Sequence, residues 1–364
     1  MSEIKHNWTK EQILDIYNKP LMELLYDAAT IHRKHHDPNT VQVSTLLSIK
    51  TGGCPEDCGY CPQAARYHTD IEGNDLMSVQ QVKAQALRAK SSGSSRVCMG
   101  AAWRNVKDGE EFDQVLEMVR TINKLDMEVC CTLGMITENQ AQRLAEAGLY
   151  AYNHNLDSSE EYYKEVISTR GFEDRLETID NVRKTNVTVC SGGIIGMGEK
   201  VEDRAGMLVA LSTLNPQPES VPINALVAVE GTPLAEEKPV SIWDMIRMVA
   251  TTRIIMPETQ VRLSAGRTEM SREGQAMCFF AGANSIFAGD KLLTTPNPDV
   301  NEDMKMFELL GLNPQKPFIK KMQPETVEAQ DSQFEALGEK PKWSRPEHKI
   351  ERNETAKQQA KAVK

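Results

Sequence analysis

Three cysteines lie in one short run of the chain, Thr51–Pro62, at Cys54, Cys58 and Cys61. Their spacing is C-x3-C-x2-C, and Tyr60 directly precedes the last of them. The glycines and prolines of this run predict a loop rather than a helix. Three thiolates this close in sequence can hold three corners of one compact metal centre. An iron–sulfur cluster held at three corners leaves one iron open to a substrate, so the spacing predicts chemistry rather than a structural metal.

Zinc is the alternative occupant of this loop. A structural zinc site usually takes four protein ligands, commonly from two C-x2-C pairs. Cys58 and Cys61 form one such pair, no second close pair exists, and His68 is the only imidazole nearby. A disulfide framework is disfavoured because the chain has 8 Cys in 364 residues and no secretory signal. We therefore favour an iron–sulfur cluster.

The composition narrows the class of protein. The formal net charge of -10 disfavours general binding of nucleic acid, which needs a basic surface. No apolar run reaches the length of a membrane span, and the first residues lack the apolar stretch of a signal peptide. We expect a cytoplasmic protein that binds neither membrane nor nucleic acid.

The cysteine loop must be positioned by the elements around it, and these alternate between strands and helices. Residues 11–36 predict a helical extension within a segment 1–38, which precedes a barrel over 39–315. Eight apolar strand candidates are 42–50, 95–99, 127–133, 150–157, 187–191, 221–228, 260–264 and 284–288. Helical spacing separates them at 79–91, 110–124, 137–147, 173–184, 201–214, 241–256 and 268–281. This order predicts an α/β protein with a (β/α)8 TIM-type barrel; a doubly wound open sheet is the alternative.

Two local features complete the expected organisation. Thr137 followed by Gln140 predicts a helix start with a capping box. From 316 to 364 the chain is rich in Pro, Lys, Glu and Gln with few large apolar residues, which predicts a mobile, charged tail.

Strand alternation indicates which side chains face the barrel lumen, because successive residues of a strand point to opposite faces. In the first seven predicted strands one face is apolar and the other carries polar groups or cysteine. The second faces converge if the barrel closes. The expected lumen residues are Cys98, Cys130, Cys190 and Arg262, with Lys50, Asn153, Asn155, Asp157 and Asn224 nearer one end. Alternation also places Cys130 in the lumen and Cys131 against a helix.

Cys98, Cys130 and Cys190 could each be an ordinary core residue, the common fate of a free cysteine. Three cysteines on the polar faces of different strands, in a chain with a cluster loop, predict instead a second metal centre. Arg262 lies among them, and no lumen carboxylate on the neighbouring strands is an obvious partner for it.

The cysteine loop resembles the signature of the radical S-adenosylmethionine (SAM) enzymes. Five further segments are Ser94–Trp103, Tyr152–Asp157, Val189–Gly193, Ser220–Asn224 and Val261–Arg267. These five resemble the biotin synthase family. The resemblance covers about residues 40–315. Lipoyl synthase, a related sulfur-inserting enzyme, is expected to carry a second N-terminal cysteine cluster, whereas no Cys precedes Cys54 here.

The resemblance implies a role for each matching residue. Cys54, Cys58 and Cys61 would hold a 4Fe-4S cluster whose open iron binds SAM, with the cluster and Arg262 serving in catalysis. Cys98, Cys130, Cys190 and Arg262 would hold a 2Fe-2S cluster. Lys50, Asn153, Asn155 and Asn224 would contact dethiobiotin, and Tyr60, Arg96, Asn155, Asp157, Gly192, Ile194 and Gly196 would lie around SAM. The glycine run 192–199 could equally be a tight turn, and Cys278 reads as helix core.

The implied reaction is insertion of sulfur between two unactivated carbons of dethiobiotin, the last step of biotin formation. One-electron cleavage of SAM would supply a radical that removes hydrogen, and the second cluster would supply sulfur. The resemblance also implies a homodimer and a flavodoxin or ferredoxin as electron donor.

Two rival classes of protein remain: a non-catalytic electron carrier and another radical SAM enzyme, such as a methylornithine-type mutase. The second should lack the lumen set Cys98, Cys130, Cys190 and Arg262.

Overall fold

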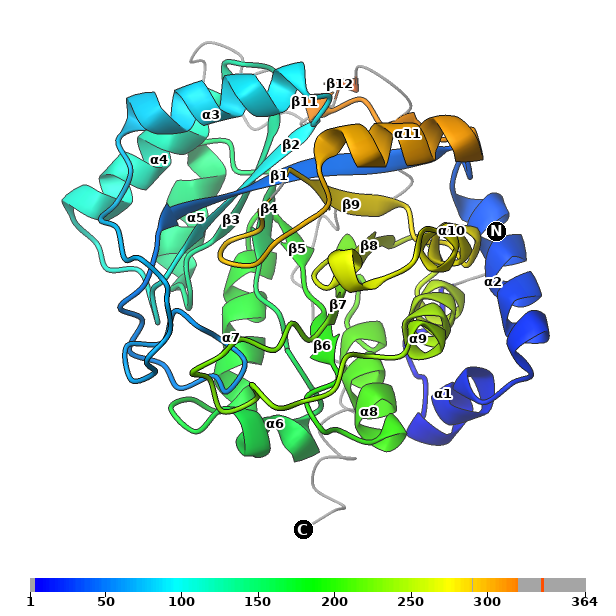
Figure 1. Ribbon diagram of the computed structural model, residues 1–364. Coiled ribbons are helices and arrows are strands. Elements are labelled where there is room, and N and C mark those ends of the chain that lie inside the picture. The colour runs from blue at the N-terminus through cyan, green and yellow to red at the C-terminus, as the bar shows by residue number, and fades with distance from the viewer. Residues whose placement is uncertain (1–3, 290, 320–334, 337–364) are drawn as a thin grey trace.

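Eight parallel strands close into a barrel in the computed structural model, which describes residues 4–289, 291–319, 335 and 336 (Figure 1). The strand order is β1-β2-β3-β4-β5-β7-β8-β9, and β9 pairs back onto β1. The strands are β1 (Thr40–Lys50), β2 (Arg96–Ala101), β3 (Glu128–Thr132), β4 (Ala151–Asn153), β5 (Thr188–Cys190), β7 (Ser220–Ala225), β8 (Gln260–Leu263) and β9 (Ser285–Ala288). The predicted (β/α)8 barrel is therefore confirmed, and the pairing of β1 with β9 excludes an open sheet.

Helices surround the barrel and bury their apolar faces against the outer face of the sheet (Figure 1). They are α3 (Val79–Ser91), α4 (Glu110–Asn123), α5 (Glu138–Glu146), α6 (Glu160–Val166), α7 (Phe172–Arg183), α8 (Val201–Ser212), α9 (Ile242–Ile255), α10 (Arg272–Phe280) and α11 (Val300–Leu310). At the start of α5 the Thr137 hydroxyl accepts from the Gln140 backbone N–H, and the Gln140 side chain accepts from the Thr137 N–H. The predicted capping box is thus present.

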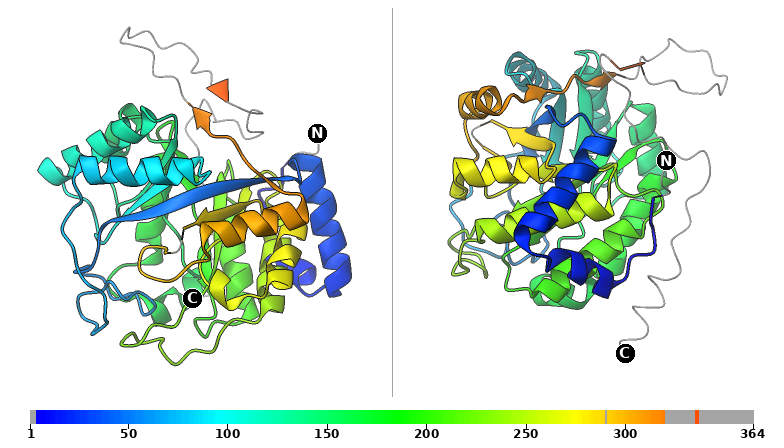
Figure 2. Two further views of the ribbon diagram at one scale, coloured as in Figure 1. Left: turned by 45° about the horizontal axis from the view of Figure 1, so that its top comes forward. Right: turned by 90° about the vertical axis from the view of Figure 1, so that its right-hand side faces the viewer.

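The predicted helical extension consists of two helices, α1 (Lys10–Tyr17) and α2 (Leu21–His35), separated at Pro20. They pack across α8 and α9 on one side of the barrel (Figure 2). Among the described residues, no helix combines the length and apolar character that a bilayer crossing requires.

Some elements differ from the sequence prediction. The strands β4 and β5 have three residues each, shorter than the predicted 150–157 and 187–191. The helices α6 and α11 and the strand β6 (Gly193–Ile195), which pairs with β7, were not predicted. The remaining short elements are η1 (Arg267–Glu269), β10 (Asn313–Pro314), β11 (Phe318–Ile319) and β12 (Glu335–Ala336). Most of the predicted mobile tail, 320–334 and 337–364, lies outside the described residues.

The strand faces follow the predicted alternation. Buried apolar side chains form two separate clusters, and Cys131 belongs to the large one between sheet and helices. Cys98 and Cys130 belong to the small one, together with Tyr150 and Phe287. The prediction that Cys130 faces the lumen while Cys131 faces a helix is confirmed.

Candidate active site

The amino end of the barrel is closed by a buried ion triad. Arg96 donates from Nε to Glu128 at 2.7 Å and from Nη2 to Glu219 at 3.2 Å. These residues stand at the amino ends of β2, β3 and β7, and Arg96 is fully buried. Arg96 pairs with Ser44 of β1. Ser44 precedes Lys50 by six residues, so it lies about 20 Å along the strand from the start of the cysteine loop. We therefore correct the expectation that Arg96 lies near SAM, because its depth and its two carboxylate partners assign it to the floor of the barrel.

The lumen cysteines lie two residues further along their strands. Cys98 and Cys130 are direct partners across β2 and β3, and both are buried. A hydrogen bond from the Cys130 thiol lowers the pKa of Cys98 and raises that of Cys130, so the two sulfurs are adjacent. Cys190, on β5, is fully buried and accepts from the Asn153 amide nitrogen at 3.2 Å. The structure thus brings the three predicted thiols to one level of the lumen.

Arg262 lies at the same level and is held from two sides. Its Nε donates to the Ser285 hydroxyl and its Nη2 to the Gln42 side-chain oxygen, both at 2.8 Å. Nη1 points to the Cys190 sulfur at 3.7 Å, and the guanidinium stacks on Phe287 at 4.7 Å. No ion pair with a carboxylate is found for Arg262 among the described residues. Because Ser285 and Gln42 are neutral, they do not cancel the positive charge of Arg262, which faces the lumen sulfurs.

The predicted asparagines surround the carboxyl ends of β4, β5 and β7. Asn153 donates to Asn155 and accepts from Thr132, each at 3.2 Å. Asn224 donates to the Gly193 carbonyl at 2.9 Å and accepts from the Ala265 N–H at 3.2 Å. Amide side chains offer both a donor and an acceptor, which suits recognition of a cyclic urea. Lys50 ends β1 and directly precedes the cysteine loop.

The glycine run covers β6 and the tight connection from β6 to α8. A Cβ added at Gly192 would lie 2.0 Å from the Pro222 carbonyl oxygen, and Gly196 has a φ of +93°. Ile194 lies in β6 between them. Glu199 accepts from the backbone N–H of Gly196 at 2.9 Å. Close packing against the Pro222 backbone explains Gly192, and the positive φ explains Gly196. Contact with SAM stays a prediction.

The cysteine loop follows β1 and is braced by its own backbone. Cys54 N–H donates to the Gln63 carbonyl at 3.0 Å, and Cys61 N–H donates to the Cys58 carbonyl at 2.9 Å. Burial raises the pKa of each loop thiol, that of Cys61 to about 12. A thiol in such surroundings becomes a thiolate when a metal displaces its proton. Tyr60 packs half-buried against the main core.

Within the described residues, no three His, Cys, Asp or Glu side chains are grouped closely enough to hold a single metal ion. A polynuclear cluster places irons and sulfides between its ligand thiolates, so its cysteines stand further apart than the ligands of one zinc ion.

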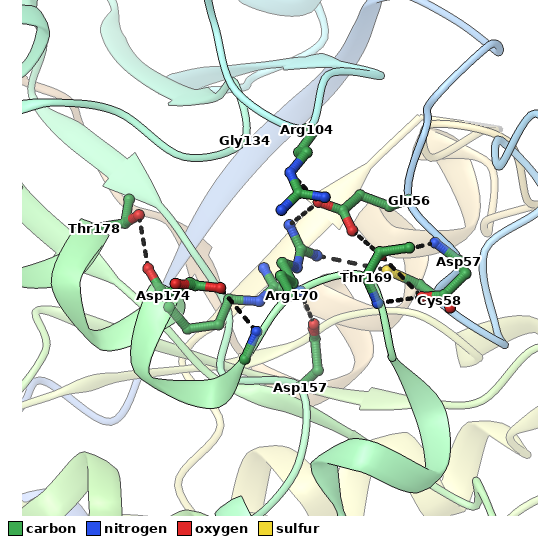
Figure 3. Close-up of polar contacts among 12 residues, drawn as sticks. Glu56, Asp57, Cys58, Arg104, Gly134, Asp157, Thr169, Arg170, Asp174 and Thr178 are labelled. Carbon is green, nitrogen blue, oxygen red and sulfur yellow. Dashed lines mark hydrogen bonds and ion pairs between the residues drawn. The ribbon is translucent and has the colours of Figure 1, made fainter.

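Charged residues around Cys58 were missed by the sequence analysis. Arg170 donates to the Cys58 sulfur at 3.5 Å (Figure 3). Arg175 forms a buried ion pair with Asp157. Glu56 lies 3.6 Å from Arg170 and 3.5 Å from Arg104. Arg170 directly precedes Gly171, the residue before α7, and Arg175 lies in the first turns of that helix. No motif in the sequence marked either arginine.

Asp57 clamps the cysteine loop to the segment after α6. Its carboxylate accepts from the backbone N–H of Ser168 at 2.9 Å and of Thr169 at 3.1 Å, and from the Ser168 hydroxyl. Burial alone would raise the pKa of Asp57, but these hydrogen bonds outweigh it and lower the pKa from 3.8 to about 2. A lowered folded-state pKa contributes stability above pH 4, and this contribution is lost as the pH falls through 2.

We expect Asp57→Asn to lower the free energy of unfolding at pH 7 by about 2 kcal/mol, the range of hydrogen bonds to a charged group. Because the asparagine does not titrate, the difference between the two proteins should shrink as the pH falls from 4 to 2. Urea unfolding at several pH values measures this. A difference that stays constant with pH would contradict the assigned pKa.

Family models match two parts of the chain. The radical SAM superfamily model matches residues 48–211, and the Biotin and Thiamin Synthesis associated domain matches 222–313. Biotin synthase of Flavobacterium psychrophilum is 88% identical over 353 residues, covering 97% of this chain and 98% of that protein. Biotin synthase of Christiangramia forsetii is 86% identical over 358 residues, covering 98% and 99%.

The chain belongs to the biotin synthase family. Members of this family are radical SAM enzymes, in agreement with the superfamily match. Among solved structures, methylornithine synthase aligns with a TM-score of 0.72 and 18% identity, covering 85% of this chain and 94% of that one. A hydrogenase maturase, HydG, aligns with a TM-score of 0.72 at 17% identity, covering 85% and 72%. At these identities the structural likeness concerns the fold, and the sequence relatives place the chain among biotin synthases.

Proposed function

We propose that this protein inserts sulfur into dethiobiotin to form biotin, using SAM and two iron–sulfur clusters. The observation that carries the proposal is the presence of two cysteine sets at different depths of one barrel. One set lies in the loop after β1, and the other lies in the lumen around Arg262. When bound, the clusters and SAM supply the electron, the hydrogen-abstracting radical and the sulfur, which side chains cannot provide.

The loop set fits a cluster with one open iron. Cys54, Cys58 and Cys61 would hold a 4Fe-4S cluster, and the described residues bring Arg170 rather than a fourth cysteine to this set. The neighbouring ion pair of Asp157 and Arg175 offers charges of both signs for the polar groups of SAM. Tyr60, Asn155, Gly192, Ile194 and Gly196 would shape the rest of the SAM site.

The lumen set fits a second cluster. Cys98, Cys130 and Cys190 would hold a 2Fe-2S cluster, with Arg262 as the fourth ligand through the nitrogen that points to Cys190. Ser285 and Gln42 orient the guanidinium by occupying its other nitrogens. Phe287 and Tyr150 belong to the same group of buried side chains as Cys98 and Cys130, and they would exclude water from the 2Fe-2S cluster.

Dethiobiotin would lie between the two sets. Asn153 borders the lumen set, because its amide nitrogen donates to the Cys190 sulfur and to Asn155. Asn153, Asn155 and Asn224 would bind the ureido ring, and Lys50 would bind the carboxylate. A flavodoxin or ferredoxin would supply electrons to a cytoplasmic homodimer.

The test is anaerobic reconstitution with iron and sulfide, followed by Mössbauer and absorption spectra and an assay of biotin. Wild type is expected to show 4Fe-4S and 2Fe-2S signals and to convert dethiobiotin. Cys190→Ala should lose only the second signal, still cleave SAM, and form no biotin. A single cluster in wild type, or biotin formation by the variant, would refute the proposal.

A further inference from the structure

Arg170 is held rigidly against the cysteine loop. Gly59 N–H donates to the Val166 carbonyl at 2.9 Å, and Asp57 N–H donates to the Thr169 hydroxyl at 3.2 Å. Together with the Asp57 carboxylate, these bonds fix the segment 166–170 relative to Cys58. The position of the Arg170 side chain is thus set by the backbone on both sides of the contact.

The guanidinium of Arg170 is engaged at all three nitrogens. Nε donates to the Tyr163 hydroxyl at 3.3 Å, and Nη1 lies 3.6 Å from Glu56 Oε1. Nη2 donates to the Cys58 sulfur at 3.5 Å, as Figure 3 shows. The Arg170 side chain is only 6% exposed, so solvent screens its charge weakly. Tyr163 and Glu56 therefore aim the third nitrogen at sulfur.

Glu56 has a second arginine partner besides Arg170. Glu56 Oε1 also lies 3.5 Å from Arg104, and Oε2 accepts from the Thr169 hydroxyl. Arg175, the other buried cation nearby, has its own carboxylate in Asp157. Two arginines thus share the one charge of Glu56, and of the two only Arg170 reaches a cysteine.

We propose that Arg170 is a positioning residue that raises the reduction potential of the cluster held by Cys58. The proposal rests on the proposed function, since it requires a 4Fe-4S cluster at the loop cysteines. Reduction adds one electron from a low-potential donor to the cluster, and no bond is made or broken. Hydrogen bonds to sulfur and a nearby positive charge stabilise the more negative, reduced form.

Arg170→Met tests this role, and Arg104→Met is the matched control. Both variants remove an arginine beside Glu56, but only the first removes a donor to sulfur. The readout is the midpoint potential of the cluster, titrated with dithionite and followed by electron paramagnetic resonance without SAM. Arg170→Met should lower the ratio of reduced to oxidised cluster about tenfold at a fixed potential, a shift of about 59 mV for one electron. Arg104→Met should shift the potential by less than half as much.

Iron and sulfide contents are measured first, so that failures can be told apart. Wild type without a 4Fe-4S cluster would refute the proposed function itself. A loaded Arg170→Met with wild-type potential, or an equal shift in Arg104→Met, would overturn the role of Arg170 alone. If the methionine variant does not hold a cluster, Arg170→Gln decides: a lowered potential supports the role, and an unchanged one overturns it.

Discussion

Replacement of Cys130 by alanine is expected to abolish biotin formation, while the same replacement of its neighbour Cys131 is expected to leave it intact. Cys130 lies in the lumen opposite Cys98, whereas Cys131 lies in the large core between sheet and helices. We expect Cys130→Ala to lower biotin formation by more than about a hundredfold, since loss of even an outer partner of a metal site typically costs 10–100-fold.

Cys131→Ala is a close control because both side chains are buried thiols in one strand. It should retain both cluster spectra and lose about 1 kcal/mol of stability, as a typical core substitution does. The measurements are iron content, the Mössbauer spectrum and biotin yield. Equal loss of the 2Fe-2S signal in the two variants would show that the loss comes from damage to the strand, and would contradict Cys130 as a ligand.

This contrast was predictable from the sequence because it depends only on local geometry. Successive side chains of a strand point to opposite faces, so a pair of adjacent cysteines must separate once the apolar face is identified. The same rule placed Cys98, Cys190 and Arg262 correctly. It required no knowledge of which strands are neighbours, only that the barrel closes.

Depth along the barrel could not be predicted in this way. Alternation puts Arg96 and Cys98 on one face, but their height depends on the register with β1, which pairs Arg96 with Ser44 far from the cysteine loop. Nor does alternation identify partners: Glu128 and Glu219 are 91 positions apart in the chain, and both contact Arg96.

Contacts between distant loops were equally hidden. Arg170 and Cys58 are separated by 112 residues, and they meet because α6 ends beside the cysteine loop. That helix has seven residues, with only Tyr163 and Val166 buried, so its periodicity gave too weak a signal. Without α6, no pattern in the sequence connected the two loops.

The second large effect is expected in stability, from Arg96→Met. Burial alone would disfavour the charged guanidinium, but Glu219 and Glu128 more than offset this and raise the pKa of Arg96. Removing it leaves two carboxylates together in the barrel floor. Breaking a buried pair in this way typically costs about 3–5 kcal/mol, and we expect at least that loss in the free energy of unfolding.

Arg143→Met is the matched control for burial. Arg143 also contacts two carboxylates, Asp108 and Asp113, and also stacks on an aromatic ring at 4.8 Å, as Arg96 does on Tyr150. Its partners are 61% and 62% exposed, so its loss should cost less than about 1 kcal/mol. Urea unfolding compares the two, and similar losses would contradict the effect of burial.

A third variant separates charge from shape at the barrel floor. Adding Glu128→Gln and Glu219→Gln to Arg96→Met removes the uncompensated charges while keeping similar volumes. Because uncharged replacements of a buried ion network are often tolerated, this triple variant should recover much of the lost stability. Failure to recover would assign the loss to packing around Arg96 rather than to its charge. Recovery would show that the two carboxylates require a cation at this depth. Arg96 would then stabilise the floor of the barrel, below the level of the lumen cysteines.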